Sequence, residues 1–278
     1  MKNFSPASKR FPDFWFTKIN IMKVIVPVDF SDISVNTAEF AASMIQGKYG
    51  ASLVLYHMFA KDDEETLVMK NLEWLQESFQ HKYHVKISCK AEQDSHFINC
   101  LTRLARFEDA DLVVMSITDR RKIVEESYSL QMIEQNICPV LVVPPSFTYK
   151  DVRNIAIACD FKKVEQLIPL VPVKKVLGLF GAKLHIVNVS SEAAHNRSDN
   201  YLAQMTALRE MFAESNPVFH FLYTEGFHES LRKFVLENKI DLVLTFPRKH
   251  SFFNYLLKGT NTRKLVYDAE VPVLAAHE

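Results

Sequence analysis

The sequence predicts an α/β protein of two tandem domains, each an open, doubly wound sheet of five parallel strands. The first observation behind this prediction is a long internal repeat, because landmarks in the first half of the chain recur about 130 residues later. A repeat of this length indicates a duplicated domain, since a solenoid unit would have a period of about 20–50 residues. The second observation is the alternation of short apolar runs with helical patterns, which is typical of parallel sheets with right-handed crossovers.

The repeat sets the domain boundaries. Four pairs of segments define it, at offsets of 130 to 133 residues: Asp29-Phe30 with Asp160-Phe161, Gly50-Ala51 with Gly181-Ala182, 111–114 with 241–244, and 138–142 with 271–275. A chain of 278 residues suits two domains of about 130 residues, each large enough for its own core. We therefore expect an N-terminal extension over 1–21, a first domain over 22–147 and a second domain over 148–278.

The elements of the first copy follow from local patterns. Short apolar runs predict buried strands over 23–29, 52–59, 85–90, 112–117 and 139–143. Helical spacing of apolar residues predicts helices over about 32–47, 62–80, 95–107 and 126–136. Ser31 or Asp32 can cap the first helix, which should end at Gly47 or Gly50. The acidic start of the second helix, at Asp62, suits the positive end of its dipole.

The second copy repeats this order of elements. Strands are predicted near 153–159, 183–189, 217–223, 241–246 and 272–276. Helices are predicted near 163–180, 193–214, 228–238 and 255–268. Pro169 and Pro172 interrupt the first of these helices, so it should kink or start late.

Composition excludes several classes of protein. Lys and Arg number 33 and Asp and Glu number 33, so overall charge favours neither nucleic acid nor an anionic membrane. No stretch approaches the roughly 18–20 apolar residues of a membrane span. The four cysteines lack metal-site spacing and read as buried thiols, which predicts a cytoplasmic protein. Residues 1–21 lack the features of a signal peptide, so we expect a loose arm, or a natural start at Met22.

The expected ligand crevice lies beyond the carboxyl ends of the strands, where doubly wound sheets bind their ligands. Asp29 and Asp160 end the first strands, and residues 58–59 and 189–190 end the second strands. The loops after the fourth strands begin at residues 116 and 246. An Asp at such a position can contact a ligand, and it can equally bond the following turn or cap the next helix.

At these residues the chain resembles the universal stress protein family in its tandem two-domain form. The resemblance covers about 22–146 and 152–278 and rests on the order and spacing of segments 26–31, 53–57, 111–115 and 138–143. It implies the adenine-nucleotide α-hydrolase-like fold. It also implies that the fifth strands, 139–143 and 272–276, pair edge to edge across a pseudo-twofold axis, which protects two apolar edges. The tandem then imitates a homodimer, and further dimerisation is left open.

Nucleotide-binding members of this family carry Gly-x2-Gly-x9-Gly-Ser/Thr after strand four, where glycines and a helix start let backbone N–H groups approach phosphates. The resemblance implies that the Asp ending strand one contacts ribose and that the end of strand two lines the adenine pocket. In the first copy, Glu126-Ser127 stands where Gly-Ser is expected, and the loop 116–127 contains no glycine. Only Asp29 and Ser127 remain as candidate ligand contacts, so we expect no ATP in the first copy.

The second copy keeps more of the motif. Gly259-Thr260 follows Lys249 at the motif spacing, and Arg248 adds a second basic group that could hold an anion by charge. Together with Asp160 and Val189, these residues form the candidate site for ATP or another anionic small molecule. Phe246 opposes this interpretation, because its ring can fill the space that ribose or phosphate would need.

Other candidates carry less weight. His57 lies in an apolar strand and reads as a satisfied core histidine, while His81-x2-His84 lacks the two further ligands of a metal site. The sequence contains no recognised catalytic motif. We therefore expect a non-catalytic stress-response module that binds or interacts, with at most one residual nucleotide or anion pocket in the second domain. The alternatives are slow ATPase or nucleotide-switch activity in that domain, and a metal-binding or lipid-binding derivative.

Overall fold

The computed structural model describes residues 22–276 except 62, 118–126, 160, 162, 190–198, 223–226 and 247–270. Ten strands are described: β1 (Met22–Pro27), β2 (Ala51–Phe59), β3 (Lys86–Gln93), β4 (Leu112–Ser116), β5 (Val140–Val143), β6 (Asn154–Cys159), β7 (Lys183–Val189), β8 (Val218–Leu222), β9 (Leu242–Thr245) and β10 (Val273–Ala275). The described helices are α1 (Asp32–Ile45), α2 (Glu65–Tyr83), α3 (Phe97–Phe107), α4 (Tyr128–Glu134), α5 (Val164–Leu167), α6 (Leu170–Leu177), α7 (Asp199–Met211) and α8 (Phe227–Glu237), with a 3₁₀ turn η1 (Ala213–Ser215).

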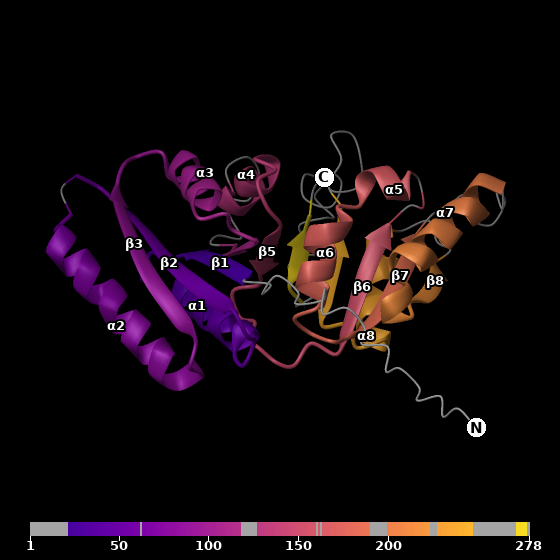
Figure 1. The fold of residues 1–278 in the computed structure, drawn as a ribbon, viewed down its shortest axis with the longest axis horizontal. Helices are drawn as coiled ribbons and strands as arrows, with labels where there is room; N and C mark the ends of the chain where they lie inside the picture. The colour runs from indigo at the N-terminus through magenta and orange to yellow at the C-terminus, as the bar shows by residue number, and fades with distance from the viewer. Residues whose placement is uncertain are drawn as a thin grey trace, which may run out of the picture.

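The strands form one continuous sheet in the order β3-β2-β1-β4-β5-β10-β9-β6-β7-β8 (Figure 1). Within each half the strands are parallel. Both halves have the same strand order when each is read inward from its own edge of the sheet. The second half repeats these parallel pairings strand for strand. The predicted fold class, two doubly wound five-stranded units in tandem, is therefore confirmed.

The two halves join through an antiparallel pair, β5 with β10. Leu141 lies opposite Leu274, and Val140 and Val142 lie opposite Ala275 and Val273. Because Leu141 and Leu274 are equivalent at the repeat offset of 133, the register is symmetric about this one pair. The predicted edge-to-edge pairing of the fifth strands is confirmed, and the two predicted sheets are halves of one.

The core has two layers, one on each face of the sheet, as the alternation of side chains along a strand requires. In β1, for example, Val24 and Val26 belong to one buried cluster and Ile25 to the other. The first cluster is closed by residues of α1, α2, α6 and α7, and the second by residues of α3, α4 and α8. Helices on both faces leave the carboxyl ends of the strands as the place where polar groups can gather.

The described helices follow the predicted order, with shifted ends. The helix predicted over 163–180 is two pieces, α5 and α6, because Pro169 stands at the N-cap of α6 and Pro172 in its first turn, where proline is tolerated. The predicted kink or late start is therefore confirmed. The helix predicted near 255–268 lies outside the described residues. Within the described ranges, no helix is both long and apolar enough to span a membrane.

Candidate functional site

Asp29 lies two residues after the end of β1, at the mouth of the predicted crevice of the first copy. Its carboxylate Oδ1 accepts hydrogen bonds from the Ser31 backbone N–H at 3.0 Å and from Ser31 Oγ at 2.5 Å. Ser31 is in turn the N-cap of α1 and accepts from the Ser34 N–H at 3.3 Å. Partial burial alone would raise the pKa of Asp29, but the hydrogen bonds from Ser31 and Ser34 together lower it. The charge of Asp29 thus fixes the turn that opens α1.

The same backbone frame is built in both copies. Phe30 and Phe161, the residues after the paired aspartates, both have positive φ, 61° and 53°. At the end of the second strand, the His57 imidazole Nδ1 bonds the carbonyl oxygen of Val28 at 2.7 Å. Its repeat partner Asn188 donates from Nδ2 to the equivalent carbonyl of Cys159 at 3.2 Å. The interpretation of His57 as a satisfied histidine is confirmed, and its ring also lies 4.6 Å from that of Phe30.

Two further polar side chains of the first crevice that the structure describes, Ser116 and Ser127, are also bonded internally. Ser116 Oγ, at the end of β4, donates to the carbonyl of Val143 at 2.9 Å. Ser127 is the N-cap residue of α4, and its Oγ lies 2.8 Å from Ser129 Oγ. No described hydrogen bond links Asp29 with Ser127, so the structure does not bring these two predicted contacts into one network.

The second crevice differs because it contains unpaired polar atoms. Among the described side chains, Asn188 Oδ1 and Thr245 Oγ1 are buried without a hydrogen-bond partner. Asn188 is 1% exposed at the end of β7, and Thr245 is fully buried at the end of β9. Such atoms are uncommon in folded proteins and call for a physical explanation. Sequence reasoning missed both, since only the strand register shows which partners are absent.

Most of the predicted second-copy site lies outside the described residues, namely Asp160, Arg248, Lys249, Gly259 and Thr260. For Val189 the structure describes the backbone, which pairs with Leu222 of β8. Phe246, immediately after β9, is 7% exposed and belongs to the same buried cluster as Phe161. The Phe246 ring, which we expected to oppose ligand binding, is therefore part of the core.

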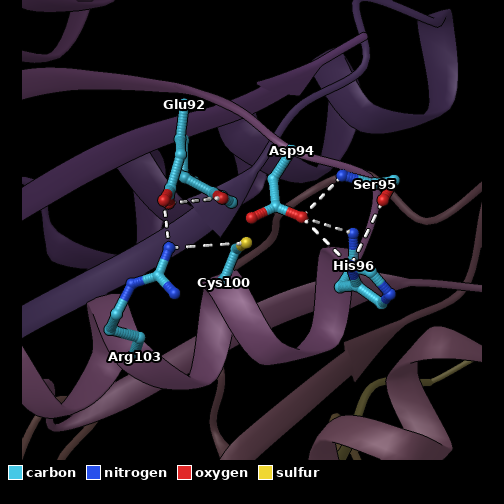
Figure 2. Close-up of polar contacts among 7 residues, drawn as sticks. Glu92, Asp94, Ser95, His96, Cys100 and Arg103 are labelled. Atoms are coloured by element: carbon cyan, nitrogen blue, oxygen red, sulfur yellow. Dashed lines mark hydrogen bonds and ion pairs between the residues drawn. The ribbon is translucent and has the colours of Figure 1, made fainter.

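A further polar cluster lies where β3 leads into α3 (Figure 2). One ligand atom from each of Glu92, Asp94 and Cys100 lies within 4.8 Å of the others, a grouping that could hold a metal ion. The sequence did not reveal it, because its residues come from a strand, a loop and a helix with no recognised motif spacing. His81 and His84, the pair noted in the sequence, are both exposed, and no such group in the described ranges contains them.

Comparison with known proteins gives a clear answer for the fold. No protein-family model and no curated protein matches the sequence. A universal stress protein from Archaeoglobus fulgidus superposes with a TM-score of 0.63 at 16% identity, covering 92% of this chain and 96% of that one. A putative universal stress protein from Pseudomonas aeruginosa gives 0.61 at 14% identity, with 92% and 93% covered. The cytoplasmic domain of a prokaryotic cation chloride cotransporter gives 0.57 at 13% identity, with 92% and 95% covered.

These matches extend over nearly the whole chain, so both halves and their junction are shared. The molecule is a tandem doubly wound α/β protein. More specifically, it has the fold of the universal stress proteins, and the resemblance seen in the sequence is confirmed at the level of the fold.

Proposed function

We propose that this chain is a tandem universal stress protein that acts as a non-catalytic binding or interaction module in the stress response, with one residual ligand pocket in the second copy. The observation that carries the proposal is the difference between the copies at the end of the second strand. His57 bonds the Val28 carbonyl, whereas Asn188 makes the equivalent bond and leaves its Oδ1 unpaired and buried. The first crevice therefore needs no ligand, and the second has an acceptor to offer one.

The cost of that unpaired acceptor supports a ligand role. A buried polar atom without a partner costs about 1–3 kcal/mol, which a donor on a bound molecule would recover. The predicted contacts Arg248, Lys249, Gly259 and Thr260 would add an anion-binding part to the same pocket. An adenine nucleotide offers both an amino donor and phosphates, so it is the ligand class that fits best.

The proposal places the protein in a reducing compartment, the cytoplasm. The four cysteines all lie in the described part of the chain and form no disulfide. Burial raises the pKa of the Cys89 thiol to about 11 and that of Cys138 to about 12, which keeps both protonated and unreactive at neutral pH. Buried, protonated thiols are ordinary in proteins of reducing compartments.

A second candidate function is ATP binding with slow hydrolysis or a nucleotide switch in the second copy. The Asn188 acceptor favours ligand binding in both candidates, and the buried ring of Phe246 opposes it in both. The two candidates agree on where a ligand binds and differ on whether phosphate is released. Phosphate release therefore separates them.

Calorimetry with ATP and Mg²⁺ tests the pocket, with Gly259→Glu and Asn188→Leu as the disabling variants and Ser127→Glu as the matched change in the first copy. The proposal expects micromolar binding that Gly259→Glu abolishes, Asn188→Leu weakens and Ser127→Glu leaves intact, without phosphate release. Steady phosphate release that Gly259→Glu removes would favour the second candidate. Absence of heat at millimolar ATP would overturn the nucleotide pocket. Binding that Ser127→Glu abolishes, and Gly259→Glu does not, would mean that the ligand binds in the first copy, which also contradicts the proposal.

A further inference from the structure

The strongest unassigned feature is the cluster at the carboxyl end of β3, defined by Glu92, Asp94 and Cys100. Each residue is held in place by other contacts. Asp94 Oδ1 accepts from the backbone N–H groups of Ser95 at 2.6 Å and His96 at 2.9 Å, which fixes its carboxylate at the start of α3. Its other oxygen points toward Cys100 and Glu92 (Figure 2). Donor atoms oriented by such supporting contacts are what a metal site requires.

Cys100 provides the buried end of the cluster. It is 1% exposed and belongs to the second buried cluster, and its sulfur lies beside the Asp94 and Glu92 carboxylates (Figure 2). Its backbone N–H bonds the His96 carbonyl at 3.1 Å, so the first turn of α3 carries the thiol to the same side as Asp94. Glu92 reaches the cluster from β3, where the Tyr56 hydroxyl bonds its Oε2 at 3.3 Å.

We propose that Glu92, Asp94 and Cys100 bind Zn²⁺ or a similar thiophilic divalent cation, with Arg103 as a cation that the metal displaces. A sulfur and two carboxylate oxygens suit zinc, which takes three protein ligands and a water at bond lengths of about 2.0–2.3 Å. The donor atoms lie within 4.8 Å of one another, so rotation of the two carboxylates can close the set around an ion. Magnesium and calcium would not use the thiolate.

Arg103 balances the negative charge of the cluster when no metal ion is bound. Its guanidinium contacts Glu92 and lies 3.6 Å from the Cys100 sulfur, so it supplies the positive charge between these acceptors. The Arg103 side chain is 59% exposed. An exposed ion pair of this kind contributes little to stability, so the guanidinium can swing into solvent when a divalent cation arrives.

The second copy provides an internal comparison. Glu92 pairs with Met58 in the first copy, and Leu222 pairs with Val189 at the equivalent place in the second. An apolar residue therefore meets the demands of the fold at that position. The carboxylate of Glu92 is present in the first copy and absent from the equivalent Leu222, so packing of the fold does not require it.

The test uses untagged full-length protein titrated with Zn²⁺ in competition with a chromogenic chelator, and with Co²⁺ as a spectroscopic probe. We expect one Zn²⁺ per chain and a thiolate-to-cobalt charge-transfer band. Cys100→Ser should remove the band and weaken binding by more than about 100-fold, beyond the roughly 10–100-fold typical of supporting residues. Cys89→Ser, which changes a half-buried thiol of β3, the strand of Glu92, should leave both unchanged.

Two further variants make the result decisive if Cys100→Ser disturbs the fold. Glu92→Gln keeps the shape of the side chain and should weaken Zn²⁺ binding. Arg103→Met removes the competing charge and should tighten it. No binding at millimolar excess, binding insensitive to Glu92→Gln, or a cobalt band that Cys89→Ser removes would each overturn the proposal and leave the cluster as a contact that only fixes α3 on β3.

Discussion

The histidine pair of the second half predicts a measurable loss of stability on mild acidification. His185 of β7 and His220 of β8 lie side by side, with Nδ1 of the first 3.0 Å from Nε2 of the second. His185 Nε2 lies 3.4 Å from Asn154 Oδ1, and the Phe234 ring packs against both imidazoles. In this network His185 donates from Nε2 to Asn154 and accepts at Nδ1 from His220, which requires the His185 ring to be neutral.

The magnitude and sign follow from the pKa of each group. Burial, followed by the charges of His220 and Lys183, lowers the pKa of His185 from 6.5 to about 4, and burial also lowers that of His220. Because the unfolded chain binds protons more readily, the contribution is complete above pH 6.5 and is lost as the pH falls toward 4. A shift of about 2.5 units corresponds to roughly 3 kcal/mol at full strength. The His185 side chain is 4% exposed, but His220, which causes part of its shift, is only half-buried, so solvent screening reduces this contribution to about 1–2 kcal/mol.

Urea unfolding at several pH values between 7.5 and 4.5 measures this contribution to the free energy of unfolding. A tenfold change in the folding constant corresponds to about 1.4 kcal/mol. His185→Gln keeps a polar side chain beside Asn154 and should flatten the pH dependence by about 1–2 kcal/mol relative to wild type. His81→Gln, at an exposed position on α2, is the matched control and should leave the curve unchanged. Because the carboxylates are the same in wild type and in both variants, their titration cancels when the curves are compared. Parallel curves for wild type and His185→Gln would refute the reasoning.

Three other changes test the frame that holds the crevices. Leu274→Ala empties a fully buried position on the pseudo-twofold axis and should cost about 3–5 kcal/mol in urea unfolding, whereas a loss below 1 would contradict the packing of β10 on β5. Ser31→Ala removes the N-cap of α1 and a partner of Asp29, so we expect a loss of about 1–2 kcal/mol by thermal unfolding, and none if the cap is not used. Gly47→Ala places a side chain at φ 70°, where its Cβ would have nothing within 4 Å. The loss of about 1–2 kcal/mol in unfolding free energy should therefore come from backbone conformation alone, and it should be absent for Gly47→Asn, because asparagine tolerates the left-handed region.

The sequence predicted the fold well because the features that set it are local or repeated. Apolar runs mark the buried strands, glycines and prolines mark the helix ends, and the offset of about 130 residues aligns the copies. Even the pairing of β5 with β10 was expected, because the resemblance to the universal stress protein family implies it and because it covers two apolar edges. The symmetric register about Leu141 and Leu274 required the structure, because a shift by one residue leaves the sequence pattern equally apolar.

The polar details were out of reach for a different reason. Whether Asn188 Oδ1 has a partner depends on neighbours from β6 and from the loops, which no spacing along the chain encodes. Likewise, the sequence predicted that all four cysteines are buried, and this holds for Cys100, which is 1% exposed, whereas Cys89, Cys138 and Cys159 are only partly buried. Its approach to Glu92 depends on how one turn of α3 meets the edge strand β3.

The duplication makes these polar details informative about function. Both copies share the strand order, the left-handed residue after the first strand and the bond from the second strand to the first. A position where the copies differ is therefore not dictated by the fold. If both copies were only structural, each would be expected to drift toward apolar or internally bonded residues, as a buried unpaired group is costly. Instead, the second copy keeps the open acceptor of Asn188, and the first gathers a thiol and two carboxylates at β3. One chain thus presents different polar groups in its two halves, which a homodimer of identical subunits could not do.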